Sequence, residues 1–96
     1  MTQIEIENVG QPGKTYRVNS AKFAEMRRAV LAVLSDKAPG MTPVALIDAV
    51  KPILDQTLFP GGETAGWWVK AVQLDQEAKG TLRRAPRPPV RLHRVG

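Results

Sequence analysis

The chain contains no cysteine in 96 residues, which excludes disulfide frameworks, thiolate zinc sites, iron–sulfur clusters and cysteine nucleophiles. It contains a single histidine, His93, and no acidic residue lies within 15 positions of it. A catalytic triad or a histidine metal site needs such partners nearby. The glycines also lack the spacing of a phosphate-binding or dinucleotide-binding loop. We therefore expect no enzymatic activity, no bound metal and no cofactor.

Long apolar runs are also absent, and no stretch approaches the roughly 20 residues of a membrane span. The first residues alternate in polarity and include Glu5 and Glu7, unlike a signal peptide. Apolar residues make up 43% of the chain and charged residues 24%, as in an ordinary globular domain. These features predict a soluble cytoplasmic protein without membrane contact, folded as one domain over residues 1–96.

Positive charge is concentrated at one end of the chain. The net charge is +5, and residues 79–96 hold six basic residues and no acid. The rest of the chain has eight basic and nine acidic residues, a net charge of −1. A nearly neutral body with a strongly basic end is typical of a protein that meets a polyanion with one edge.

The periodicity of apolar residues predicts a β-hairpin over residues 3–18 and three helices within residues 20–79. The first helix follows Ser20 and stops in the Pro- and Gly-containing segment 36–40. The second starts at Thr42-Pro43, a capping residue followed by a proline at the first helical position. Pro52 then either kinks this helix or ends it.

The third helix is expected over residues 65–79, with Thr64 as its cap. One of its faces is apolar and is expected to be buried, and the opposite face is polar and is expected to be exposed. The first set is Trp67, Ala71, Leu74 and Ala78, and the second is Lys70, Gln73, Gln76 and Glu77.

Residues 81–95 predict a second β-hairpin, which is basic and has an Arg/Pro-rich turn. From residue 85 onward the same segment is also compatible with a disordered tail. Three helices followed by a basic hairpin are the order of a winged helix-turn-helix domain, in which the hairpin is the wing. The expected fold class is therefore α+β, a winged helix-turn-helix-like three-helix core with a C-terminal wing and an extra N-terminal hairpin.

Four segments carry a resemblance to a known family. They are residues 12–18, Pro60-Gly61-Gly62, residues 66–80 with the run Gly-Trp-Trp-Val-Lys, and residues 90–94. Together they resemble a family of small bacterial single-domain proteins of unknown function. The resemblance covers nearly the whole chain and implies a bacterial origin, but it implies no catalytic or binding residue. A looser similarity of the third helix and wing to winged-helix domains of DNA-binding and restriction proteins implies function only by analogy.

The charge and the expected fold favour a non-catalytic module that binds nucleic acid or has a regulatory role, with double-stranded DNA as the candidate partner. On the third helix, Gln73 can pair with adenine and Lys70 can reach guanine or phosphate. The acids of this region oppose such binding, because residues 63–79 have a net charge of −1. Phosphate contacts would then fall mainly to the hairpin arginines. These are Arg83, Arg84, Arg87, Arg91 and Arg94.

The alternative is a protein-interaction or homodimerisation module that does not bind nucleic acid. Trp67 and Trp68 are adjacent, so a helix buries both only if it is covered over a wide arc. We expect Trp67 in the core and Trp68 at the surface. There, Trp68 and Val72 would form an apolar patch for another protein or a second copy of the chain. The sequence does not decide between DNA and RNA.

Overall fold

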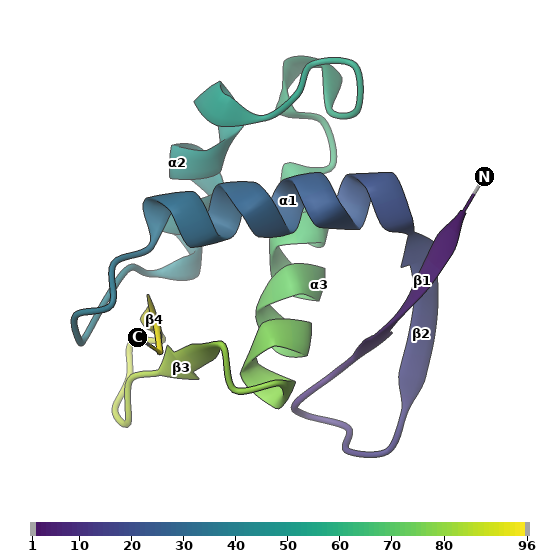
Figure 1. The fold of residues 1–96 in the computed structure, drawn as a ribbon. Helices are drawn as coiled ribbons and strands as arrows, with labels where there is room; N and C mark the ends of the chain where they lie inside the picture. Colours follow the sequence, from purple (N-terminus) through teal and green to yellow (C-terminus); the bar gives the residue numbers. More distant parts are fainter. Residues whose placement is uncertain (1, 96) are drawn as a thin grey trace.

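The computed structural model describes residues 2–95, which form a small α+β domain (Figure 1). In chain order, a two-stranded antiparallel sheet comes first, three α-helices follow, and a second two-stranded antiparallel sheet comes last. Among these residues, no helix combines the length and apolarity that crossing a bilayer would require. The elements in chain order are β1 (Gln3–Glu7), β2 (Thr15–Asn19), α1 (Ser20–Val33), α2 (Pro43–Val50), α3 (Ala65–Ala78), β3 (Leu82–Arg84) and β4 (Leu92–Arg94).

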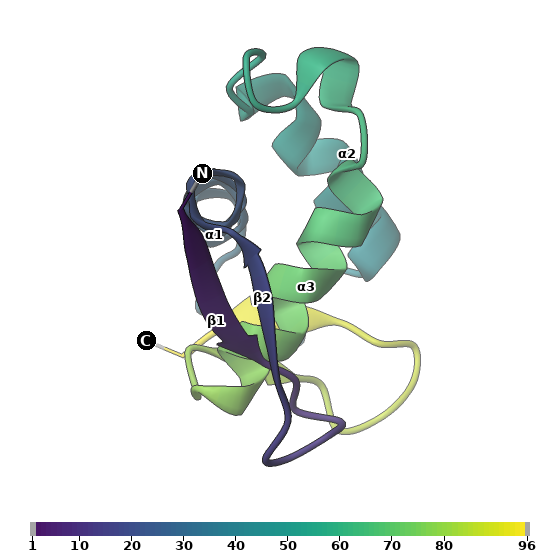
Figure 2. The ribbon, with the colours of Figure 1, turned by 90° about the vertical axis from the view of Figure 1, so that its right-hand side faces the viewer.

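The predicted N-terminal hairpin is confirmed. Antiparallel pairing of β1 with β2 places Ile4 opposite Val18 and Ile6 opposite Tyr16, so these four side chains share one face. Ile6 and Val18 are buried against the helices, whereas Ile4 is 40% exposed and Tyr16 is 43% exposed. Figure 2 shows the hairpin beside α1 and α3, and β1 contacts both helices. The apolar face of the hairpin is therefore only partly covered.

The helix α1 begins one residue earlier than expected. Its cap is Asn19, whose side-chain oxygen accepts a hydrogen bond from the backbone N–H of Lys22 at 2.9 Å. Ser20 is already helical, and its hydroxyl donates to the carbonyl of Thr2. At the other end, α1 stops at Val33, before the Pro- and Gly-containing segment.

The helix α2 begins as predicted, with Thr42 accepting a hydrogen bond from the backbone N–H of Ala45 and Pro43 at the first helical position. It ends at Val50, and a single 3₁₀ turn, Lys51–Ile53, continues the chain. Pro52 lies in this turn. Because proline lacks an N–H and its ring clashes with the preceding helical turn, it ends the α-helix here instead of kinking it.

The C-terminal hairpin packs against the connection between α1 and α2. The alternative of a disordered tail from residue 85 onward is therefore wrong for residues 85–95. Gly96 lies outside the described residues. β3 pairs with β4, and Leu92 of β4 also forms a bridge to Met41 in the α1–α2 connection. The two backbone hydrogen bonds of this bridge are 2.7 and 2.9 Å long. Gly40 precedes the bridge with φ 90°, and a Cβ there would lie 1.8 Å from the Leu92 carbonyl oxygen. The backbone of Gly40 and Met41 thus lies directly against that of Leu92 and holds the hairpin in place.

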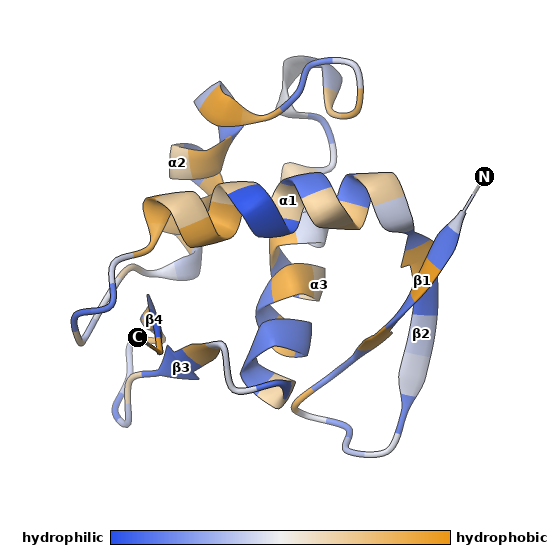
Figure 3. Ribbon diagram, in the orientation of Figure 1, coloured by the Kyte–Doolittle hydropathy of each residue, from blue (hydrophilic) through white to orange (hydrophobic). Residues whose placement is uncertain are grey.

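One hydrophobic core joins the three helices, and it receives apolar side chains from both hairpins. Figure 3 shows the apolar segments in the C-terminal half of α1, in α2 and in the middle of α3. In the same view, the C-terminal half of α3 and most of β3 are hydrophilic. The largest fully buried apolar side chains are Phe59, Met26, Leu34, Leu46, Leu92, Val30, Val50, Val69 and Val72.

Candidate nucleic-acid interface

The helix α3 is the element that the sequence singled out for nucleic-acid contact, and its buried face differs from the predicted one. Trp68 is 9% exposed and Val72 is fully buried, whereas Trp67 is 60% exposed. The expected core position of Trp67 and the expected surface patch of Trp68 and Val72 are therefore wrong. α3 contacts α1, α2 and β1, and its core-facing side includes Trp68, whose ring lies edge-on to Phe59.

Two polar residues of the face expected to be exposed are also buried. Gln73 is 6% exposed and Gln76 is 2% exposed, so Gln73 offers little surface for the predicted contact with a base. Gln73 donates a hydrogen bond to Glu77, and Gln76 accepts one from Arg27 of α1. Burial of polar groups is tolerated when they are hydrogen-bonded, and a hydropathy pattern does not reveal such pairing.

Asp75 is the most buried charged residue of α3, with no exposure. Its Oδ1 accepts the backbone N–H of Glu7 at 2.8 Å, which ties β1 to α3. Its Oδ2 accepts from Gln76, and the ammonium of Lys79 lies 2.8 Å from Oδ1. The spacing of Asp75 and Lys79, four residues apart on a helix, is the signal in the sequence for this pair. The carboxylate is therefore neutralised within the fold.

Glu77 is the second acid of α3, and it is neutralised by the basic hairpin. Its side chain is 8% exposed, and Oε1 accepts from Gln73 at 2.9 Å and from Arg84 of β3 at 3.1 Å. Arg84 remains 43% exposed. With Asp75 and Glu77 both enclosed, Lys70 is the one charged side chain on the outward side of α3 that has no hydrogen bond or ion pair among residues 2–95.

The five candidate arginines of the hairpin have different environments. Arg83 and Arg87 are exposed and have no hydrogen-bond or ion-pair partner within the described chain. Arg91 is half-buried, and its Nε is enclosed without a partner among the described residues. Arg94 donates from Nε to the carbonyl of Leu34 at 2.6 Å, next to the end of α1. Arg94 therefore satisfies a helix-terminal carbonyl with its Nε, and this contact fixes its side chain against the end of α1.

Lys70 and the basic hairpin meet at one groove. This groove has a volume of about 280 Å³ and lies between α2, α3 and the hairpin. Lys70 and Arg84 line it together with Val90, and Pro43 and Ile47 of α2 form another wall. The structure thus brings together Lys70, Gln73 and Arg84 from the predicted set, and the exposed Arg83 and Arg87 belong to the same hairpin.

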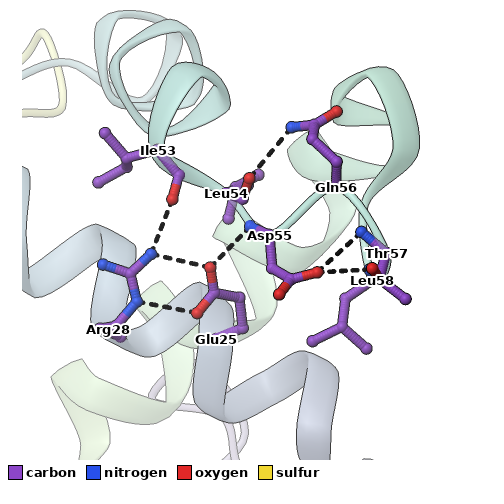
Figure 4. Close-up of polar contacts among 8 residues, drawn as sticks. All are labelled: Glu25, Arg28, Ile53, Leu54, Asp55, Gln56, Thr57 and Leu58. Atoms are coloured by element: carbon purple, nitrogen blue, oxygen red, sulfur yellow. Dashed lines mark hydrogen bonds and ion pairs between the residues drawn. The ribbon is translucent and has the colours of Figure 1, made fainter.

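A separate charged cluster joins α1 to the segment that follows α2 (Figure 4). Arg28 donates two hydrogen bonds of 2.8 Å to Glu25 and a third to the carbonyl of Ile53. Glu25 also accepts the backbone N–H of Asp55 at 2.8 Å. The hydrogen bonds from Arg28 lower the pKa of Glu25, against the opposing effect of desolvation, and the Asp55 N–H lowers it further. This cluster fixes the segment after α2 to α1.

These features define a small α+β domain in which Lys70 of α3 and Arg84 of the C-terminal hairpin line one groove. The chain belongs to a family of unknown function (DUF6958), whose model matches residues 3–92. The predicted membership of a family of unknown function is thereby confirmed. No curated protein and no solved structure matches the chain.

Proposed function

We propose that this chain is a non-catalytic nucleic-acid-binding domain of winged-helix type that contacts double-stranded DNA with α3 and the hairpin β3–β4. The order of three helices followed by a basic hairpin supports this proposal. The bridge between Met41 and Leu92 supports it as well, because it anchors the hairpin beside the helices instead of leaving it to project freely. An anchored hairpin holds its arginines in a defined position relative to Lys70.

The observation that carries the proposal is the neutralisation of the acids on α3. By sequence, the third-helix region has a net negative charge, which opposes binding to a polyanion. In the fold, Asp75 is fully buried and Glu77 is 8% exposed, and each is paired with a cation. The groove between α3 and the hairpin therefore presents Lys70, and Arg83 and Arg87 are exposed elsewhere on the hairpin.

Binding of a fluorescent random-sequence duplex, followed by anisotropy between about 50 and 200 mM salt, tests the proposal. Three phosphate contacts, from Lys70, Arg83 and Arg87, predict a slope of log K against log salt of about −2.7. The double variant Arg83→Ala/Arg87→Ala removes two of these contacts and is expected to reduce the slope to about −0.9.

Lys14→Ala is the matched control, because Lys14 is an exposed cation in the turn of the other hairpin. It is expected to leave the slope unchanged. Absence of duplex binding at low salt would contradict the proposal, and so would an equal loss of affinity in the Lys14 control and the double arginine variant.

The alternative, a protein-interaction module, depended on Trp68 and Val72 as surface residues, and both are buried. Trp68 and Val72 are packed within the domain, where the ring of Trp68 lies edge-on to Phe59 with centroids 6.2 Å apart. Substituting either residue is therefore expected to reduce stability before it affects any partner. The exposed tryptophan of the pair is Trp67, which lies on the side of α3 that faces the N-terminal hairpin.

A further inference from the structure

A second groove lies between α3 and the N-terminal hairpin. It has a volume of about 350 Å³, within the usual range for ligand sites. Apolar side chains such as Ile6 and Leu74 line it, together with the rings of Tyr16 and Trp67. Lys70 lines both this groove and the groove beside the basic hairpin, so the two share one cation.

The two aromatic residues of the groove are the exposed ones of the chain. Trp67 is 60% exposed and Tyr16 is 43% exposed, whereas Phe23, Phe59 and Trp68 are buried. The ring of Trp67 packs edge-on against Trp68, with centroids 5.0 Å apart and an interplanar angle of 74°. The hydroxyl of Tyr16 donates to the side chain of Gln11. Both rings are thus held in place while their faces remain accessible, which is the condition for stacking with a planar partner.

The charges around these rings favour an anionic partner. Arg17 and Lys70 line the groove, against a single acid, Glu7. Arg17 and Lys70 are exposed and have no hydrogen-bond or ion-pair partner in the part of the chain that the structure describes. Fixed aromatic rings beside unpaired cations are the combination by which proteins hold unpaired nucleobases and their phosphates.

We propose that this groove binds single-stranded nucleic acid, with unpaired bases stacked on Trp67 and Tyr16 and the backbone phosphates next to Lys70 and Arg17. Bases in a duplex are already stacked on their neighbours, so their faces are not available to the two rings. The inference goes beyond the duplex proposal and depends on different residues, Lys70 excepted. A protein partner would use the same apolar walls, but it would not require the two cations.

Titration with a short oligothymidylate, followed by tryptophan fluorescence, tests the inference. Trp67 is the exposed tryptophan, so we expect the oligonucleotide to quench its emission while Trp68 remains shielded. Trp67→Leu and Tyr16→Leu, measured by anisotropy of a labelled oligonucleotide, are each expected to weaken binding by roughly five- to 150-fold. Trp67→Phe and Tyr16→Phe retain a ring and are expected to retain most of the affinity.

The duplex titration separates this inference from the proposed function. Trp67→Leu is expected to leave duplex binding unchanged, and Arg83→Ala/Arg87→Ala is expected to weaken duplex binding while single-strand binding persists. If Trp67→Leu and Tyr16→Leu bind oligothymidylate as tightly as the unmodified chain, the inference is wrong. It is also wrong if Trp67→Leu changes the sedimentation coefficient from that of a dimer to that of a monomer while no oligonucleotide binds.

Discussion

The guanidinium of Arg84 lies 3.1 Å from Oε1 of Glu77, and this ion pair joins the basic hairpin to α3. The same carboxylate oxygen accepts a hydrogen bond from Gln73, which lies one helical turn earlier. The pair removes an acid from the proposed DNA-binding surface, and it also holds Arg84 away from a phosphate. Among the five hairpin arginines, Arg83 and Arg87 are the ones that are both exposed and without an internal hydrogen bond or ion pair in the described chain.

Glu77→Gln is expected to strengthen duplex binding. The substitution removes a negative charge beside Lys70 and releases Arg84, which adds about one phosphate contact and makes the salt slope more negative by about 0.9. The lost ion pair is partly exposed, so the stability cost is expected to be about 1 kcal/mol or less. Anisotropy titrations at two salt concentrations measure the duplex affinity and its salt slope. Glu63→Gln is the control, because it makes the same charge change at an exposed site next to the start of α3. Equal effects of the two variants would show that the release of Arg84 does not matter.

Asp75→Ala is expected to destabilise the domain by on the order of 3 kcal/mol. The backbone N–H of Glu7 would lose its acceptor, and the partly buried Lys79 would lose its carboxylate. Urea denaturation followed by circular dichroism measures the change in the free energy of unfolding. Asp48→Ala, at an exposed position of α2, is the control and is expected to change it by about 0.5 kcal/mol or less. Similar values for the two variants would show that Asp75 does not anchor β1.

Gly40→Ala is expected to be much more damaging than Gly13→Ala. Both glycines have positive φ, 90° and 87°, so alanine incurs a backbone cost of about 1–2 kcal/mol at either position. A Cβ at Gly13 would meet nothing within 4 Å, whereas one at Gly40 would lie 1.8 Å from the Leu92 carbonyl oxygen. The difference between the two variants in urea denaturation therefore measures the contact between the α1–α2 connection and β4. Equal losses of unfolding free energy in the two variants would show that the α1–α2 connection shifts to accommodate the Gly40→Ala side chain without further destabilisation.

Stability is expected to fall in acid partly through Glu25. Its pKa is lowered in the folded chain, from an ordinary value of 4.5, because Arg28 donates hydrogen bonds to the ionised carboxylate. A carboxyl group with a lowered folded-state pKa contributes stability above its unfolded pKa, and this contribution is lost as the pH falls through the folded-state pKa. Glu25→Gln is therefore expected to reduce the melting temperature at neutral pH and to flatten its decline below pH 4.5. Parallel melting curves for the variant and the unmodified chain across this pH range would contradict the assignment.

Hydrophobic periodicity and breaker residues predicted the elements of the fold well. The hairpin over residues 3–18, the start of α2 at Pro43 and the break at Pro52 are all present. These features depend on local chemistry: the alternation of side chains along a strand, a capping hydroxyl and a missing N–H. Thr64 is a partial exception, because it occupies the cap position of α3 but has φ 61° and makes no capping hydrogen bond.

The exposure of individual side chains on α3 was not predictable in the same way. Helical periodicity assigned Trp67 to the core and Gln73 to the surface, and both assignments are reversed. Trp68 is buried because its ring packs against Phe59, and the polar residues are buried because each has a partner: Gln73 has Glu77, Asp75 has the backbone N–H of Glu7, and Gln76 has Arg27. The contacts to Phe59, Glu7 and Arg27 join residues far apart in the chain, so they leave little trace in a single sequence.

The sequence by itself determined the order and type of the helices and hairpins and that positive charge gathers after residue 78, because both follow from local residue type. Only the tertiary structure decided which charges remain free. Folding encloses Asp75 and Glu77 with cations and ties Arg94 to the end of α1, while Lys70, Arg83 and Arg87 stay exposed. The physical reason is that a buried carboxylate must find a partner wherever the fold brings one within reach.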